Sequence, residues 1–371
     1  MAEYEVRIYD NSLQLVDIME DFEYLNWNRK WQLGNNFSLI ISHYSKSAKH
    51  LKEDHYIDIW RNGQCEFIGI IEHKNIELNQ EGKISENWEI KGKSILSRRI
   101  CIPPSGSAYD EINSNGEAVL KHYVDNNIVN PTNANRKIDV LINEVNQNRG
   151  SNVSIRARYD DLVDKLQEAA IASELGYEVV FDGSNLLFKI IEGSDKRTAQ
   201  SSTAPVIFSP DLGNIKLQNY QWSKLDRFNM LYVAGQGEGA VRTIEGVFNE
   251  TSEPSGLDRK ESFMDARDLD TSTKLTQRGE TKINEQGPTQ IFETEILNHG
   301  PFKYRKDWDL GDIITVRNIE WDILAHLRIQ QTNVSIDSSN ENIQVSFGSP
   351  YPNFIQKMKR ELNKTSQVLR K

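Results

Sequence analysis

The sequence predicts a mainly β protein of the α+β class, with two tube-forming β-barrel domains, an inserted small α+β domain and a C-terminal helix. Three observations predict this class. Short strands with period-two alternation fill the first hundred residues, helical spacing is concentrated within residues 107–200, and strands return after Pro205. The chain has 371 residues, more than one hydrophobic core usually serves, so we expect several domains.

Residues 1–106 are expected to form the first β-barrel domain. β-branched and aromatic runs there are separated by Gly and Asn, as strands are separated by turns. Arg61-Asn62-Gly63-Gln64 places an Asn-Gly pair between two runs, and both residues accept the positive φ of a tight hairpin. The expected strands are Tyr4 to Tyr9, Phe37 to Ser42, Tyr56 to Trp60, Glu66 to Ile71 and Trp88 to Ile90.

Residues 107–200 are expected to form the α+β accessory domain. Apolar side chains recur at helical spacing from Gly116 to Asn126 and from Tyr159 to Leu175. Asp160 is the expected N-cap of the second helix, and Gly176 is its expected left-handed end. A hairpin is expected to follow, with the strands Tyr177 to Phe181 and Leu186 to Ile190.

Residues 201–350 are expected to form the second β-barrel domain, after a small and polar stretch, 194–205, that predicts a linker or exposed loop. A charged helix near 270–286 interrupts its strands, and a basic amphipathic helix is expected in residues 351–371. The expected strands are Val206 to Phe208, Ile215 to Trp222, Asn229 to Val233, Arg242 to Phe248, Ile313 to Val316, Leu324 to Gln330 and Ile343 to Phe347.

Two distant segments have the same order and spacing of strand-like runs. The first contains Ile57 to Asn62, Phe67 to Ile71 and Trp88 to Ser94; the second contains Ile313 to Asn318, Ile323 to Leu327 and Ile343 to Ser349. Chance similarity between antiparallel strand pairs is one explanation, and duplication of a barrel is the other. With a duplicated barrel, a trimer presents six similar units around one axis.

The composition excludes several classes of function. The formal net charge of -10, from 54 acidic and 44 basic residues, disfavours wrapping around nucleic acid but suits a conduit to which DNA does not adhere. The sequence has no run of about 20 apolar residues and no signal peptide at its start, which predicts no membrane span and a cytosol-like compartment. Cys65 and Cys101 lack metal or redox spacing, so we expect reduced thiols.

The motifs that resemble chemical sites have simpler structural interpretations. Gly235-x-Gly237-x-Gly239 precedes a strand-like run where a dinucleotide loop needs a helix, so these are predicted turn glycines. His50 and His55 fit no zinc spacing. The many carboxylates include no HExxH motif and no Ser/His/Asp order. We therefore predict a non-enzymatic protein without catalytic, cofactor-binding or metal-binding residues.

Several motifs, taken in order, resemble siphophage tail hub proteins. The one that most resembles the family is Tyr304-x-x-Asp307-Trp308-x-Leu310-Gly311-Asp312, which is similar to the segment that precedes a strand in hub barrels. The others are Trp27-x-Arg29, Gly34-x-x-Phe37, Gly92-x-x-x-Leu96-x-x-Arg99, Gly116 to Val124, Asn229 to Arg242 with its three alternating glycines, and Asp265 to Leu269. Together they span about residues 5 to 350.

The resemblance implies a virion structural protein at the tail tip or baseplate hub, assembled in the cytoplasm of the bacterial host. It implies a homotrimer with a channel through which DNA and the tape-measure protein pass during DNA ejection, without specific DNA binding. The implied partners are the distal tail protein, the tail tube protein, the tape-measure protein and tip or fibre proteins. A tail-tip cell-wall hydrolase and a carbohydrate-binding adsorption protein remain alternatives.

Overall fold

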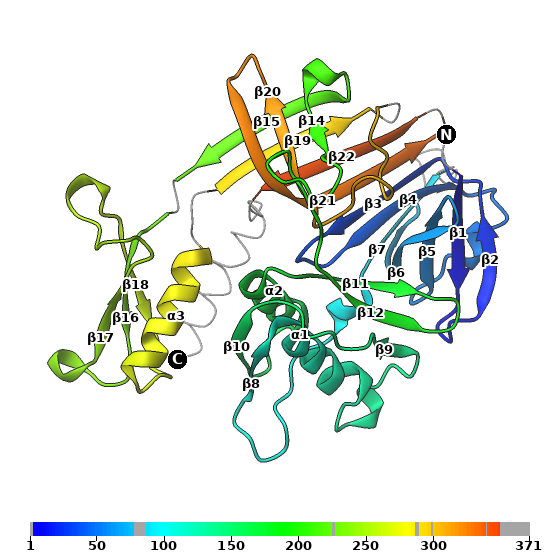
Figure 1. Ribbon diagram of the computed structural model, residues 1–371. Helices are drawn as coiled ribbons and strands as arrows, with labels where there is room; N and C mark the ends of the chain where they lie inside the picture. Colours follow the sequence, from blue (N-terminus) through cyan, green and yellow to red (C-terminus); the bar gives the residue numbers. More distant parts are fainter. Residues whose placement is uncertain are drawn as a thin grey trace. The chain divides into compact units, whose positions relative to one another are not determined.

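The computed structural model describes residues 3–77, 87–224, 227–285, 289–297, 300–338 and 340–348 (Figure 1). It divides the chain into two units, residues 1–219 with 292–347 and residues 220–291 with 348–371, and each unit is described by itself. Strands predominate over helices, which confirms the mainly β, α+β class. The expected helix in 351–371 lies outside the described residues.

A sheet of 14 strands dominates the first unit. Its main hydrogen-bonded order is β15-β19-β22-β21-β3-β4-β7-β6-β5-β1-β2, and β20 pairs with β21, β13 and β14 (Figure 1). Among the described residues, β2 and β15 each pair on one side only, so this order does not close on itself and the two barrels remain a prediction. The early strands are β1 (Tyr4–Tyr9), β2 (Leu15–Met19), β3 (Tyr24–Lys30), β4 (Asn36–Ser42), β5 (Tyr56–Arg61), β6 (Gln64–Asn75) and β7 (Asn87–Lys93). The late strands are β13 (Asp195–Lys196), β14 (Ile207–Phe208), β15 (Ile215–Ser223), β19 (Thr289–Ile296), β20 (Ile313–Asn318), β21 (Ile323–Asp337) and β22 (Glu341–Gly348).

Period-two alternation buries one face of these strands. In β22, Ile343, Val345 and Phe347 are buried while Gln344 is exposed between them. Successive side chains of a strand point to opposite faces, so this pattern sets which face meets the core. The expected hairpin at Asn62-Gly63 is confirmed, because both residues have positive φ (49° and 75°) between β5 and β6.

The α+β part of the first unit packs two helices on two small sheets. Strands β8 and β10 pair with each other, and β12 lies between β11 and β9. A continuous apolar core includes Leu120 and Tyr123 of α1, Leu166 of α2 and Phe188 of β12. The elements are β8 (Asp110–Asn115), α1 (Gly116–Val124), β9 (Leu141–Asn143), β10 (Asn152–Ala157), α2 (Leu162–Ser173), β11 (Gly176–Phe181) and β12 (Leu186–Ile191).

Both expected caps of α2 were wrong by one or two residues. The N-cap is Asp161, whose carboxylate accepts hydrogen bonds from the amides of Val163 and Asp164, while Asp160 accepts from Arg158. The left-handed C-terminal residue is Glu174, with φ of 56°. Gly176 instead opens β11 against an indole ring, where an added Cβ would lie 2.4 Å from Cε3 of Trp31. Glycine is required at position 176 because it packs closely against Trp31, and not because the helix ends there.

The second unit has its own small sheet, in the order β17-β16-β18. Leu231, Val233 and Val247 of this sheet form a core with Leu275 and Ile283 of α3. We expected the runs at 229–233 and 242–248 to belong to the second barrel, and this was wrong because they pair with each other and with β18. The elements are β16 (Met230–Ala234), β17 (Ile244–Val247), β18 (Glu261–Asp265) and α3 (Ser272–Glu285), the last within the range expected for a charged helix.

Candidate functional site

The first unit contains one five-strand arrangement twice. The order β3-β4-β7-β6-β5 recurs as β15-β19-β22-β21-β20, with β20 on the same side of β21 as β3 (Figure 1). In both copies the fourth strand of this order, β6 or β21, is long and interrupted by a bulge, after Ile71 in β6 and after Ile329 in β21. Before the bulge it pairs with the preceding strand, and near or after the bulge it pairs with the following strand.

The segment that precedes the three consecutive antiparallel strands of each copy, β5-β6-β7 and β20-β21-β22, is also repeated. We call each set of three strands the meander. Asp54 and Gly311 both have positive φ, 62° and 87°. The amide of Asp54 donates to the carbonyl of Ile71 at 3.2 Å, and that of Gly311 donates to the carbonyl of Ile329 at 2.9 Å. The residues at the bulges, Ile71 and Ile329, are therefore counterparts.

This equivalence corrects the alignment made from the sequence. Ile71 was aligned with Leu327, two residues before its structural counterpart Ile329. With Ile70 and Arg328 as counterparts just before the bulge, Ile57 corresponds to Ile314, one residue beyond the aligned Ile313. The turn between β5 and β6 is shorter than the turn between β20 and β21, so an alignment of apolar runs alone does not find the correct register. The repeated meander is nevertheless present at both places.

The predicted motif from Tyr304 to Asp312 forms a compact turn before β20. Tyr304 and Trp308 are buried with ring centroids 4.9 Å apart, and Asp307 accepts a hydrogen bond from the Lys303 amide at 2.7 Å. Leu310 is also buried. At Gly311 an added Cβ would lie 1.9 Å from Cζ3 of Trp31, so the turn needs glycine for space as well as for its positive φ.

Asp312 ties this turn to the stretch that we expected to be a linker. Its carboxylate accepts from the amide of Ser194 at 2.8 Å and from the ammonium of Lys196 at 2.7 Å. Lys196 lies in β13, which pairs in parallel with β20. The beginning of residues 194–205 is thus part of the large sheet.

A buried ionic cluster lies behind the same turn, and we name it the Arg29 clasp: Arg29, Glu66, Glu178, Tyr304 and Asp309. The guanidinium of Arg29 donates to Tyr304 at 3.0 Å, to Asp309 at 2.7 Å and to Glu178 at 2.8 Å. The hydroxyl of Tyr304 donates to Glu66 at 3.0 Å. The clasp joins β3, β6, β11 and the turn, which are far apart in the sequence.

Charge neutralisation makes this burial tolerable. Burial alone would lower the pKa of Arg29, but Asp309 and the other acidic groups around it raise the pKa well above its usual value. Burial likewise opposes ionisation of Asp309, yet Arg29 and Arg305 hold its pKa below the ordinary range. Removing one partner from such a cluster is costly, because the remaining charge stays buried without compensation.

The sequence reasoning missed most of this cluster. Arg29 entered only as part of Trp27-x-Arg29, and Glu66 and Glu178 were assigned to strands without a role. A charged residue inside an otherwise apolar strand, as Glu178 is in Tyr177 to Phe181, is the signal that indicates a buried partner.

The chain's two thiols are poorly suited to nucleophilic chemistry. Burial raises the pKa of Cys101 to about 12. Burial, with the nearby Asp58 carboxylate, raises the pKa of Cys65 well above its usual value. The thiolate is the reactive form, so both groups are held as thiols at neutral pH. Both cysteines are free, as the sequence predicted.

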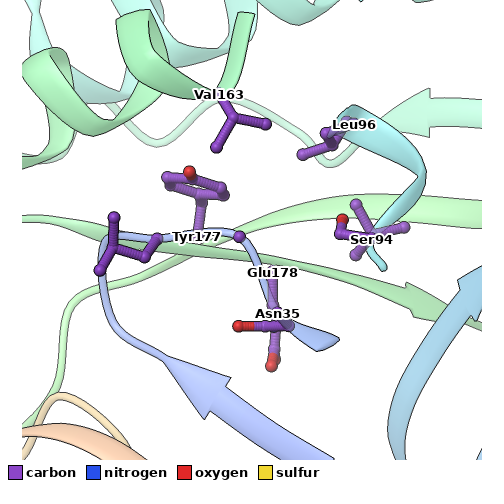
Figure 2. Close-up of a pocket in the computed structure, with 9 residues that line it drawn as sticks. Asn35, Ser94, Leu96, Val163, Tyr177 and Glu178 are labelled. Carbon is purple, nitrogen blue, oxygen red and sulfur yellow. The ribbon is translucent and has the colours of Figure 1, made fainter. Parts of the chain in front are cut away.

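The enclosed space beside the Tyr177 ring is small. It has a volume of about 10 Å³, near that of one water, and Figure 2 shows Tyr177 lying across it below Val163. A wider open hollow of about 320 Å³ is lined by Ser97, Arg98, Arg99, Ile100, Asn135, Arg136 and Asp161. In the part of the chain that the structure describes, no three His, Cys, Asp or Glu side chains gather as metal ligands.

The three predicted turn glycines follow β16, and an antiparallel strand, β17, comes after them. Gly237 and Gly239 have positive φ, 110° and 57°, whereas Gly235 does not. Gly235 instead packs on α3, where an added Cβ would lie 2.8 Å from Leu275. The geometry is that of a strand connection and differs from the helix-capped loop of a dinucleotide site.

The sequence matches the model of the family described as Siphovirus ReqiPepy6 Gp37-like protein over residues 5–349. The chain belongs to this siphovirus tail protein family. The resemblance found in the motifs is thereby confirmed at the level of a tail protein. No curated protein matches the sequence.

Solved tail proteins share the fold of this family member. The 43 kDa tail protein of prophage MuSo2 from Shewanella oneidensis has a TM-score of 0.58 and 12% identity, covering 93% of this chain and 98% of that one. The tail protein from Neisseria meningitidis MC58 gives 0.56 and 12%, covering 93% and 96%. Prophage tail protein gp18 from Listeria monocytogenes EGD-e gives 0.56 and 10%, covering 99% and 100%. Among the described residues, no helix has the length and apolarity of a bilayer-spanning segment.

Proposed function

We propose that this family member is the structural hub of a phage tail: a homotrimeric ring that closes the tail tube and connects it to the tip. The observation that carries the proposal is the five-strand order that occurs twice in one chain. A three-fold assembly of such chains presents six similar sheets around its axis. That number matches a six-fold tube, so the duplication offers a way to join the two symmetries.

Each copy of the repeat would form one barrel of the hub. The first barrel consists of β3 to β7 with β1 and β2, and the second of β15 and β19 to β22 with β13 and β14. We retain the domain boundaries 1–106, 107–200, 201–350 and 351–371 as part of the proposal, except that β16 to β18 and α3 form a separate insertion. The Arg29 clasp supports a rigid unit, because it joins strands of the first barrel to the accessory domain and to the turn before β20.

The ring would enclose a channel for DNA and the tape-measure protein. The net charge of -10 supports passage without adhesion, since like charge repels the phosphate backbone. The proposed partners are the distal tail, tail tube, tape-measure and tip or fibre proteins, and the proposed location is the tail tip of a virion assembled in the host cytoplasm.

The proposal is non-enzymatic, and the engagement of many carboxylates supports it. In the acidic run from 265 to 270, Asp265 is bound by Arg242 and Asp270 by Lys274 at 3.0 Å. Asp161 caps α2. These groups are used in helix caps and ion pairs, which leaves them poorly placed as the acid and base of a glycoside hydrolase.

One observation favours carbohydrate binding as a second candidate. On the small sheet of the second unit, Tyr232 and Phe263 are cross-strand neighbours, and Phe263 is 59% exposed. Leu231 and Val233 alternate with Tyr232 and pack with α3, so the aromatic pair lies on the opposite face of this sheet. Loss of glycan binding by Phe263→Ala, with Tyr44→Ala as the exposed-aromatic control, would support this candidate.

The test of the hub is the copy number. Native mass spectrometry of the purified full chain should give a trimer, and density for three copies should lie at the tube end in imaged particles. A different copy number at that position contradicts the proposal. Clearing of host cell wall by the purified chain would replace it with the hydrolase.

A further inference from the structure

The intrachain junction between the two copies of the repeat is made by strand edges. After its bulge, β21 pairs with β22 along one edge and with β3 along the other, from Gln331 opposite Lys30 to Asp337 opposite Tyr24. Val334 and Trp27 lie opposite each other there, and both are fully buried. The part of β21 that follows its bulge, in the second copy of the repeat, is therefore paired with β3, the first strand of the first copy.

The equivalent junction on the other side of the repeat is open. After its bulge, β6 pairs with β7 only, and β15, the counterpart of β3, pairs with β19 only, within the residues the structure describes. His73 and Lys74 near the end of β6 are exposed, and Ile76, which follows the last residue of β6, is 46% exposed. Leu217 on β15 is 61% exposed. We name residues 72–77 the β6 edge and residues 215–219 the β15 edge.

We propose that the β15 edge of one chain pairs antiparallel with the β6 edge of the next chain in the ring. This pairing would repeat between chains the β3–β21 junction that is found within each chain. The inference rests on the ring assembly proposed above and names the surfaces that form it. Open edges present unpaired amide and carbonyl groups, so they readily accept another strand. Both edges also expose an apolar side chain that pairing would cover.

The structure favours a second copy of this chain, over another protein, as the partner that pairs with each open edge. Each chain carries one β6 edge and one β15 edge, so head-to-tail pairing uses each of these two edges once and leaves neither unpaired when the ring closes. The chain also contains the template of the joint, because β3 and β21 are the counterparts of β15 and β6. Because β21 pairs antiparallel with β3 after its bulge, we expect β6 to be able to pair in the same way with β15 after its own bulge.

Disulfide trapping tests the joint in the full-length chain. His73→Cys on the β6 edge is combined in turn with Lys216→Cys, Leu217→Cys, Gln218→Cys and Asn219→Cys on the β15 edge. Side chains of a strand alternate between faces, so strong cross-linking between chains is expected for alternate positions only. Native Cys65 and Cys101 remain in all variants, and variants with only one added cysteine report any cross-link that the native cysteines form.

The matched control moves the first cysteine to another open edge. Ile18→Cys on β2, which is exposed and also lacks a second neighbour in the described sheet, should give no cross-link with the same four positions. Equal cross-linking from Ile18, or no cross-linking from His73, overturns the proposed joint. A trimer that does not cross-link overturns the joint but leaves the hub standing. A cross-linked ring of another size supports the joint and contradicts the trimeric hub, whereas a chain that stays monomeric contradicts both.

Discussion

The guanidinium of Arg29 and the carboxylate of Glu178 form an ion pair at 2.8 Å, with side chains only 2% and 12% exposed. Arg29 belongs to the large sheet and Glu178 to the accessory domain, so this pair connects two parts of the first unit. Removing one partner leaves a buried charge without compensation.

Glu178→Ala is therefore expected to lower the free energy of unfolding by about 3 kcal/mol, the usual cost of breaking a buried pair. Lys274→Ala, which removes the exposed pair with Asp270, should change it by less than about 0.5 kcal/mol. Urea unfolding of both variants measures the difference. An effect of Glu178→Ala as small as that of Lys274→Ala would show that the clasp contributes little.

Gly311→Ala should destabilise the turn before β20 for two reasons. A left-handed residue other than glycine costs about 1–2 kcal/mol, and the clash with Trp31 adds about 1–3 kcal/mol. Gly213→Ala is the matched control, because Gly213 has φ of 60° and open space around an added Cβ. Thermal unfolding should show a clearly larger loss for Gly311→Ala, and equal losses would argue against the steric contact.

Asp58 should make the protein less stable as the pH rises through 6. Burial raises the pKa of this carboxyl to about 6, and hydrogen bonds from Trp60 and Cys65 only partly offset the shift. The folded state then binds more protons than the unfolded state between the ordinary carboxyl pKa and 6, so the stabilisation is complete at low pH and is lost on going up through that interval. The total change is at most about 3 kcal/mol.

Asp58→Asn removes this titration. Between pH 4 and pH 7.5, the urea midpoint of the wild type should therefore fall relative to the urea midpoint of Asp58→Asn. Other titrating groups are common to both proteins and cancel. A difference that is constant over this range would mean that Asp58 titrates normally.

Glu117 should show the opposite dependence. Burial would raise its pKa, but hydrogen bonds from Arg149 and Lys121 outweigh burial and hold the pKa well below its usual value. The stabilisation is present above the ordinary carboxyl pKa and is lost as the pH falls. Glu117→Gln should thus be less stable than the wild type near neutral pH, and the gap should narrow on acidification. Chemical unfolding at several pH values checks the narrowing.

Local features of the first unit were predictable because their causes lie within a few residues. Asn62-Gly63 produces a hairpin through the backbone freedom of those two residues, and the period-two runs became strands. The caps of α2 were less predictable, because Asp160 and Asp161 are equally good caps by chemistry. The helix start decided between them.

The candidate site was only partly predictable. The turn from Tyr304 to Asp312 was singled out, and its burial follows from its aromatic residues. Its ionic partners Glu66 and Glu178 were not, because no sequence spacing links them to Arg29. The runs at 229–233 and 242–248 were assigned to the wrong sheet, since strand propensity does not specify a neighbour.

The sequence by itself indicated many of the strands and helices, the Asn62-Gly63 turn and the presence of a repeated pattern, but not the strands β2, β3, β18 and β19. Only the tertiary structure decided that β3 pairs with β21, which edges of the repeat stay open, and that Arg29 is buried among three acidic side chains. The physical reason is range. Turn chemistry and side-chain alternation act between near neighbours, whereas strand pairing and burial depend on which distant segments the packed core brings together.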